Sequence, residues 1–87
     1  MSLMVSESQS YKNFTATTTI AQPGLKMLGI FCASSSAGTI KVQDGSNTVV
    51  NTFTAVAGTF YPMPAEMQTS LVLTVTGALD ATVFYSL

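Results

Sequence analysis

Side chains alternate with a period of two through residues 70–87, SLVLTVTGALDATVFYSL. Leu71, Leu73 and Val75 fall on one face of an extended strand, and the residues between them fall on the other face. The segment GALD, residues 77–80, has the composition of a turn, and the β-branched and aromatic residues after it again favour a strand. We therefore predict a β-hairpin in which two strands flank a tight turn.

Two further strands are predicted upstream. Residues 13–20 alternate between apolar and hydroxyl side chains, which is typical of a half-buried strand. Residues 25–33, LKMLGIFCA, are apolar on both sides apart from Lys26, as expected for a central strand, and Gly29 indicates a bulge or a close backbone approach. The Ser-rich residues 34–38 are predicted to form a flexible loop.

The remaining segments predict a second hairpin and an edge strand. Residues 39–43 and 48–54 alternate on either side of a turn with the sequence DGSN at residues 44–47. The segment TFYPMP, residues 59–64, is a short strand that its two prolines confine to a sheet edge or bring to an end. Residues 65–69 are predicted to be a connection with room for one helical turn.

Strand-like segments therefore follow one another at a spacing of about 8 to 12 residues, without an apolar period of about 3.6. We predict an all-β fold: a single small antiparallel β-sandwich, jelly-roll-like, with about seven strands and minimal helix. The predicted domain covers residues 11–87. Residues 1–10 are predicted to be a leader and a flexible N-terminal arm, because MSL looks like an expression-vector leader and VSESQS is polar and unpatterned.

The composition argues against several classes of partner. Charged residues make up 8% of the chain, and the formal net charge is −1. Three dispersed Lys cannot neutralise a run of phosphates, so no nucleic acid partner is expected. No run approaches the 18 or so apolar residues of a spanning helix, so no membrane partner is expected, and the sequence lacks the pattern of a signal peptide. Weak charge gives little protection against association, so we expect a homo-oligomer, with a trimer favoured.

The residues also offer little chemistry. The chain has no His, which removes the commonest general base and metal ligand. Asp44 and Asp80 both stand in predicted turns beside Gly, where Asp is expected for its backbone hydrogen bonds. Cys32, the single cysteine, lies in the most apolar segment and is expected to be buried. We predict that the protein is not an enzyme and that it has no catalytic, cofactor-binding or metal-binding residues.

Aromatic residues are the remaining candidates for contact with a partner. Five of them leave room for a sugar-stacking pair, but most of the five are expected in the core of so small a domain: Phe31, Phe53, Phe60, Phe84 and Tyr85. The residues predicted to form an interaction surface are Tyr11, Asp44, Asn47 and Tyr61. The alternative function is a carbohydrate- or receptor-binding module, which usually has exposed aromatic residues with Asn, Asp or Arg close by, and here only the turn at Asp44 offers part of that pattern.

Residues 38–86 also resemble a known class of proteins. With the GTIKVQDG turn, the NTFT segment, the GTFYPMP strand and the closing DATVFY, they are similar to small β-sandwich proteins encoded by tailed bacteriophages. The resemblance implies a virion component, such as a capsid decoration or cement protein or a small head or tail accessory protein. It also implies a symmetric oligomer that contacts capsid or other virion proteins after assembly in the host cytoplasm. It implies no catalytic residue.

Overall fold

The structure is a computed structural model that describes residues 9–87, and its secondary structure consists of strands. Six antiparallel strands form one open sheet, and residues 9–87 contain no helix. The strands are β1 (Gln9–Phe14), β2 (Thr18–Ile20), β3 (Lys26–Asp44), β4 (Asn47–Thr54), β5 (Thr59–Glu66) and β6 (Leu71–Ser86). The predicted all-β class with antiparallel strands is confirmed, and six strands replace the predicted seven.

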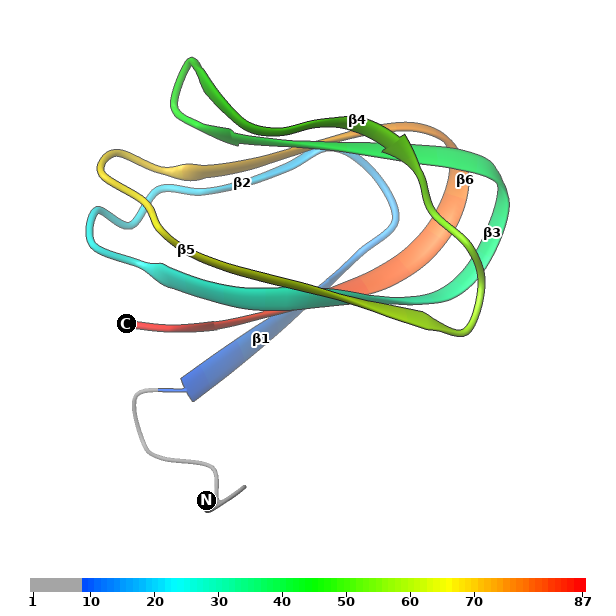
Figure 1. The fold of residues 1–87 in the computed structure, drawn as a ribbon, viewed down its shortest axis with the longest axis horizontal. Coiled ribbons are helices and arrows are strands. Elements are labelled where there is room, and N and C mark those ends of the chain that lie inside the picture. The colour runs from blue at the N-terminus through cyan, green and yellow to red at the C-terminus, as the bar shows by residue number, and fades with distance from the viewer. Residues whose placement is uncertain (1–8) are drawn as a thin grey trace.

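Two long strands, β3 and β6, form the backbone of the sheet. They pair with each other from Lys26 opposite Ser86 to Asp44 opposite Leu71, and they bend together near their middles (Figure 1). At the bend Ser34 lies opposite Asp80. The sheet therefore folds over on itself without a break in the pairing of its two central strands.

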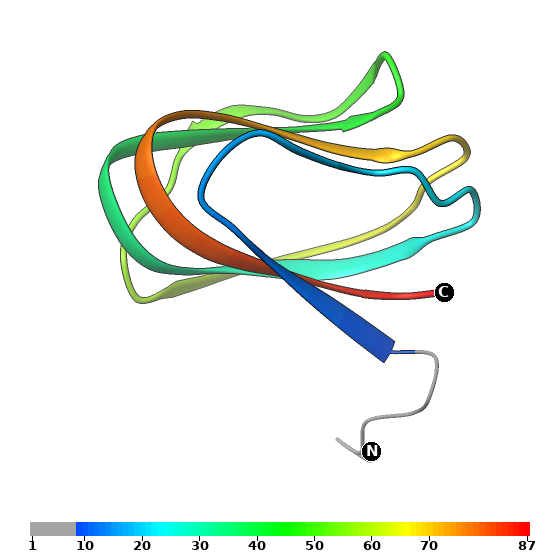
Figure 2. The same ribbon diagram turned by 180° about the vertical axis from the view of Figure 1, so that it is seen from behind.

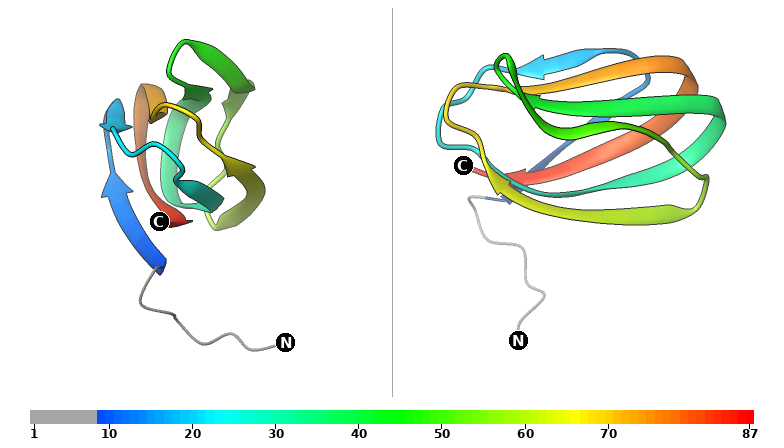
Figure 3. Two further views of the ribbon diagram at one scale, coloured as in Figure 1. Left: turned by 90° about the vertical axis from the view of Figure 1, so that its left-hand side faces the viewer. Right: turned by 45° about the horizontal axis from the view of Figure 1, so that its top comes forward.

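The bend divides the sheet into two halves of four strands each. One half contains β1, β5, residues 26–32 of β3 and residues 81–86 of β6, and we call it the β5 half. The other contains β2, β4, residues 39–44 of β3 and residues 71–76 of β6, and we call it the β4 half. The view from behind and the view tilted so that the top comes forward show these halves facing each other (Figure 2 and the right-hand panel of Figure 3).

The backbone at the bend needs small residues. Gly77 has a φ of 82° and Ala37 a φ of 57°, both in the left-handed region. A Cβ on Gly77 would lie 2.6 Å from the carbonyl oxygen of Ala37, so the two strands approach too closely there for a side chain. The predicted hairpin of residues 70–87 and the predicted loop of residues 34–38 are therefore wrong. Both segments with turn composition are bends within continuous strands, and they pair with each other.

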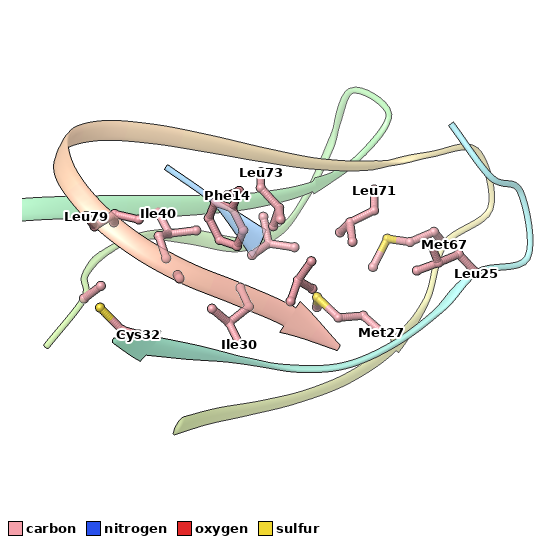
Figure 4. Close-up of a cluster of buried hydrophobic side chains, with 14 residues drawn as sticks. Phe14, Leu25, Met27, Ile30, Cys32, Ile40, Met67, Leu71, Leu73 and Leu79 are labelled. Atoms are coloured by element: carbon pink, nitrogen blue, oxygen red, sulfur yellow. The ribbon is translucent and has the colours of Figure 1, made fainter. Parts of the chain in front are cut away.

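The core lies between the two halves. Figure 4 shows the buried side chains pointing from both halves into this space. They include Ile30 and Val83 from the β5 half and Ile40 and Leu73 from the β4 half, each fully buried. Alternation along each strand accounts for this arrangement, because every second side chain points inward. Burying such an aliphatic side chain contributes about 1.5–3 kcal/mol.

The other predicted elements are confirmed in part. The hairpin around residues 44–47 forms, with Gly45 at a φ of 60° as the first residue of its two-residue turn. The proline-containing strand β5 lies at an edge of the sheet, where it pairs with β3. The predicted strand of residues 13–20 is wrong as a single element, because the chain leaves β1 after Phe14 and starts β2 at Thr18. Residues 67–70 connect β5 to β6 without a helical turn.

Candidate interaction surface

The β5 half carries exposed aromatic side chains on the face that points away from the core. Each of its four strands contributes one of them, and 38% to 72% of each residue is exposed. An aliphatic residue of β3 and a proline of β5 lie beside them and are also exposed. We call this surface the aromatic face, and it consists of Tyr11, Leu28, Phe31, Phe60, Pro62 and Phe84.

Strand register makes the aromatic face continuous. Tyr11 of β1 lies opposite Phe84 of β6, and Phe84 in turn lies opposite Gly29 of β3. In the neighbouring row Phe31 of β3 lies opposite Phe60 of β5. Side chains that face each other across adjacent strands are about 4.5–5.5 Å apart at Cβ, so these residues form one patch and not isolated exposures. Contiguous apolar patches of this kind mark interaction sites on soluble proteins.

Gly29 lets two aromatic rings meet across β3. A Cβ at Gly29 would lie 2.6 Å from Cζ of Phe60 and 2.7 Å from the carbonyl oxygen of Tyr61. The ring of Phe60 therefore lies over the glycine, and its centroid is 6.4 Å from that of Phe84 in an edge-to-face arrangement. The predicted bulge and close approach at Gly29 are both confirmed, since the register shifts between Met27 and Gly29.

A polar group borders the aromatic face at the end nearest the bend. The side-chain amide of Asn13 donates to Oδ1 of Asp80 at 2.7 Å and to the carbonyl oxygen of Ala81 at 3.0 Å. Its distance to Oγ1 of Thr82 is 3.4 Å. Asn13 lies opposite Thr82, which lies opposite Phe31, so this polar group and the aromatic rings share one outer surface.

The four residues predicted as an interaction surface do not come together. Tyr11 belongs to the aromatic face and is 72% exposed. Asn47 is exposed at the turn between β3 and β4, in the other half of the sheet. Asp44 and Tyr61 point inward from their strands, so neither is a surface residue of the kind that the sequence predicts.

Tyr61 is held by contacts with its own chain. It is partly buried against the core, and the centroid of its ring is 5.0 Å from that of Phe53 at an interplanar angle of 55°. Its hydroxyl oxygen accepts a hydrogen bond of 2.9 Å from the backbone N–H of Val56. These contacts give Tyr61 a structural role in fixing the loop between β4 and β5.

Asp44 fixes the connection between β5 and β6. Only 9% of the residue is exposed, and its carboxylate accepts backbone N–H groups from Gln68 at 2.8 Å, Thr69 at 2.8 Å and Ser70 at 3.3 Å. The N–H groups of Gln68 and Thr69 are the main causes that lower the pKa of Asp44 below its ordinary value of 3.8; desolvation opposes them, and Ser70 lowers it further. A carboxylate with this many partners acts as a clamp on the backbone.

Cys32 is a buried core residue, as predicted. Burial raises the pKa of its thiol, and the negative charge of Asp80 raises it further, while a hydrogen bond with the Ser34 carbonyl oxygen lowers it. The raised pKa keeps Cys32 in the thiol form, which is the unreactive form.

The prediction that most aromatic residues lie in the core is wrong for Phe31, Phe60 and Phe84, which are 38%, 49% and 38% exposed. The exposure of Phe84 could have been predicted from alternation along the strand. Ala81 and Val83 both point inward, so Phe84, the residue after Val83, points outward. Hydrophobicity alone does not distinguish an inward from an outward position.

No protein-family model, curated protein or solved structure matches the chain. Within the described part of the chain, no group of three or more His, Cys, Asp or Glu residues is placed to hold a metal ion. Residues 9–87 also contain no helix long and apolar enough to cross a membrane.

Proposed function

We propose that this chain is a non-enzymatic structural protein of a bacteriophage virion, of the capsid decoration or small head or tail accessory type. It acts by burying its aromatic face against other protein subunits. The observation that carries this proposal is the aromatic face itself, which is contiguous, exposed and spread over the four paired strands of the β5 half. Aromatic residues are enriched at the buried centres of protein interfaces.

The rest of the molecule is consistent with a role that depends on packing. The 14 buried apolar residues form a core to which Phe31 and Phe84 do not belong, so these aromatic residues are free to contact a partner. A partner that binds the folded state also stabilises the assembly by mass action, which requires no chemistry. We class the folded-over sheet with small jelly-roll-like sandwiches, because its two halves enclose one core.

The proposal is tested by purifying virions from cells that carry the phage genome encoding this chain. The chain should co-purify with the particles at a fixed copy number, measured by quantitative mass spectrometry. The double variant Phe60→Ser/Phe84→Ser should remain folded by circular dichroism and be lost from the particles. The control Thr74→Ser/Thr76→Ser also introduces two serines, both on β6 in the other half, and should be incorporated normally. Absence of the unmodified chain from the particles would overturn the proposal.

One observation favours a carbohydrate- or receptor-binding module as a second candidate. The hydrogen-bonded pair of Asn13 and Asp80 lies beside Tyr11 and Phe84, which combines aromatic surface with carboxylate and amide groups. Binding to a glycan array that is lost on Tyr11→Ala and on Asn13→Ala would support this candidate. Binding that survives both substitutions would place any glycan elsewhere on the molecule.

A further inference from the structure

We propose that the aromatic face is the contact surface of a twofold dimer, in which a second copy of the chain lies face to face on the first. This inference rests on the proposed role of the aromatic face as a protein-contact surface, and it names the partner. Support for it comes from the way in which the outer side chains line up across the four strands of the β5 half, and from the positions of the charged side chains among them.

Strand register orders the outer side chains into rows on either side of a midline. The midline is the row whose side chains point inward, which contains Val83 of β6 and Ile30 of β3. The row on one side of it consists of Asn13, Thr82, Phe31 and Phe60. The row on the other side consists of Tyr11, Phe84, Gly29 and Pro62. The ring of Phe60 reaches across to Gly29, so aromatic side chains cover the centre of the face.

Opposite charges lie at the two ends of this face. Lys26 of β3 lies opposite Ser86, at the end of β6. Asp80 lies opposite Ser34, next to the bend. Ser86 and Asp80 are equally far from Val83 along β6, so the positive and the negative end are placed symmetrically about the midline. Glu66 lies opposite Lys26 on β5, so this end holds one charge of each sign, and the complementarity to Asp80 rests on Lys26.

This symmetry makes the face complementary to itself. A half-turn about an axis in the plane of the sheet, along the midline and across the strands, lays the aromatic face of a second copy on that of the first. The same rotation exchanges the two ends, so Lys26 of each copy comes to lie over the end that carries Asp80 of the other. Such a contact uses one surface patch on both copies, as a twofold interface requires.

The distances are within the reach of a lysine. Packed sheets lie about 10 Å apart, and β3 and β6 are neighbours about 4.8 Å apart, so the two Cα atoms would be separated by roughly 11 Å. Lys26 lies about 10 Å from the twofold axis, measured along the strand. Packed sheets are usually rotated by about 30° relative to each other, and at this distance that rotation displaces Lys26 by only about 5 Å. The other cation on these strands, Lys12, lies opposite Val83 and alternates with Tyr11 and Asn13, so its side chain leaves β1 on the side away from the aromatic face.

The size of the face sets the expected strength. Four strands about 4.8 Å apart and about seven residues long give a patch of roughly 19 by 23 Å, so the two copies would bury about 900 Å² in total, which is the size of a weak, transient interface. With a formal net charge of −1, the copies repel each other only weakly. We therefore expect a reversible dimer with a micromolar dissociation constant, and a pair instead of the trimer that the sequence favoured.

A charge exchange tests this geometry. Sedimentation equilibrium should show the wild-type chain rising from its single-chain mass of 9.1 kDa to twice that mass as concentration increases. Lys26→Glu alone and Asp80→Lys alone should each weaken the dimer by about tenfold or more, because like charges then meet across the interface. An equimolar mixture of the two variants should associate at least as strongly as the wild type, since both contacts become attractive in the mixed pair. Recovery in the mixture also shows that both variants fold.

Lys41→Glu, on the outer face of the other half, should leave the dissociation constant unchanged. A wild-type chain that stays monomeric, forms a trimer, or gives a mixture with no recovery would overturn the dimer. A monomer that is still incorporated into virions through its aromatic face would overturn only the dimer and leave the proposed function standing. A dimer that recovers in the mixture, formed by a chain that is absent from virions, would overturn the proposed function and leave the dimer standing.

Discussion

In the β5 half four of the side chains that point away from the core are aromatic, whereas in the β4 half the side chains that point away from the core are mainly threonines. On the central strands of the β4 half, Thr39, Lys41 and Gln43 alternate with buried residues of β3, and Thr74 and Thr76 do so on β6. We call this second surface the threonine face. The two halves share one core, one pair of long strands and the same inward alternation.

The difference separates what folding requires from what folding leaves open. Inward positions are apolar in both halves because both enclose the same space. Threonine on an outer face fits a solvated strand, since it has high β-propensity and a hydroxyl group for water. The phenylalanine side chain has no polar group that can bind water, so its exposure is unfavourable in the isolated chain. Folding alone therefore does not explain the composition of the aromatic face.

The largest expected effect concerns the shared core. Ile30→Ala in the β5 half and Leu73→Ala in the β4 half each remove a fully buried side chain. Each should lower the free energy of unfolding by about 2–5 kcal/mol, measured by urea denaturation. Both variants should keep a single transition, because the two halves bury one core and unfold together. Separate transitions for the two halves would show that each half is stable by itself and would break the comparison.

The next effect concerns the bend that joins the halves. Gly77→Ala places a methyl group within 2.6 Å of the Ala37 carbonyl oxygen, at a φ of 82°. Gly58→Ala is the matched control, since its φ is 77° and nothing lies within 4 Å of the added Cβ. The control should cost about 1–2 kcal/mol of stability from backbone strain alone. Gly77→Ala should cost at least about 1 kcal/mol more, because backbone must also move. Equal losses would mean that the two strands are not in close contact at the bend.

The bend is also where sequence reasoning failed. Gly77 and the serines at 34–36 are typical of turns, and a turn and a bend need the same small, flexible residues. Whether the chain reverses or continues depends on its neighbour, since residues 34–37 pair with residues 78–80 on a strand far away in sequence. No local pattern contains that pairing. The hairpin at Gly45 was predictable because its strands are adjacent in sequence and its turn closes on itself.

Less of the candidate interaction surface than of the fold was predictable from the sequence. Tyr11 is predicted to be exposed, and it does belong to the aromatic face. Asp44 stands beside the turn and accepts backbone N–H groups, as predicted, but its partners belong to a connection 24 to 26 residues away, which no local pattern indicates. Phe60 and Phe84 meet over Gly29 only through the register of three strands, which the sequence does not specify.

A smaller effect concerns the clamp at one end of the β4 half. Because its hydrogen bonds lower the pKa of Asp44 below 3.8, the unfolded chain binds the proton more tightly than the folded chain. The stability that this carboxylate contributes is therefore present above pH 3.8 and is lost as the pH falls through the lowered pKa. Asp44→Asn should lower the Tm at neutral pH and converge with the wild type in acid. A variant that keeps the full loss in acid would assign that loss to other groups.

The smallest expected effect on folding is also the sharpest test of the comparison. Phe84→Ser and Thr74→Ser each place serine on the outer side of β6, the first on the aromatic face and the second on the threonine face. Thr74→Ser should change the free energy of unfolding by no more than about 0.5 kcal/mol, as surface substitutions usually do. Phe84→Ser should cost about 0.5–1.5 kcal/mol for the lost edge-to-face contact with Phe60, in addition to the apolar area that Phe84 buries, measured at low protein concentration. At high concentration the wild type and Thr74→Ser should gain stability from association, whereas Phe84→Ser should not. Equal gains in all three proteins would show that the aromatic face takes no part in association, and the outer surfaces of the two halves would then differ in composition alone.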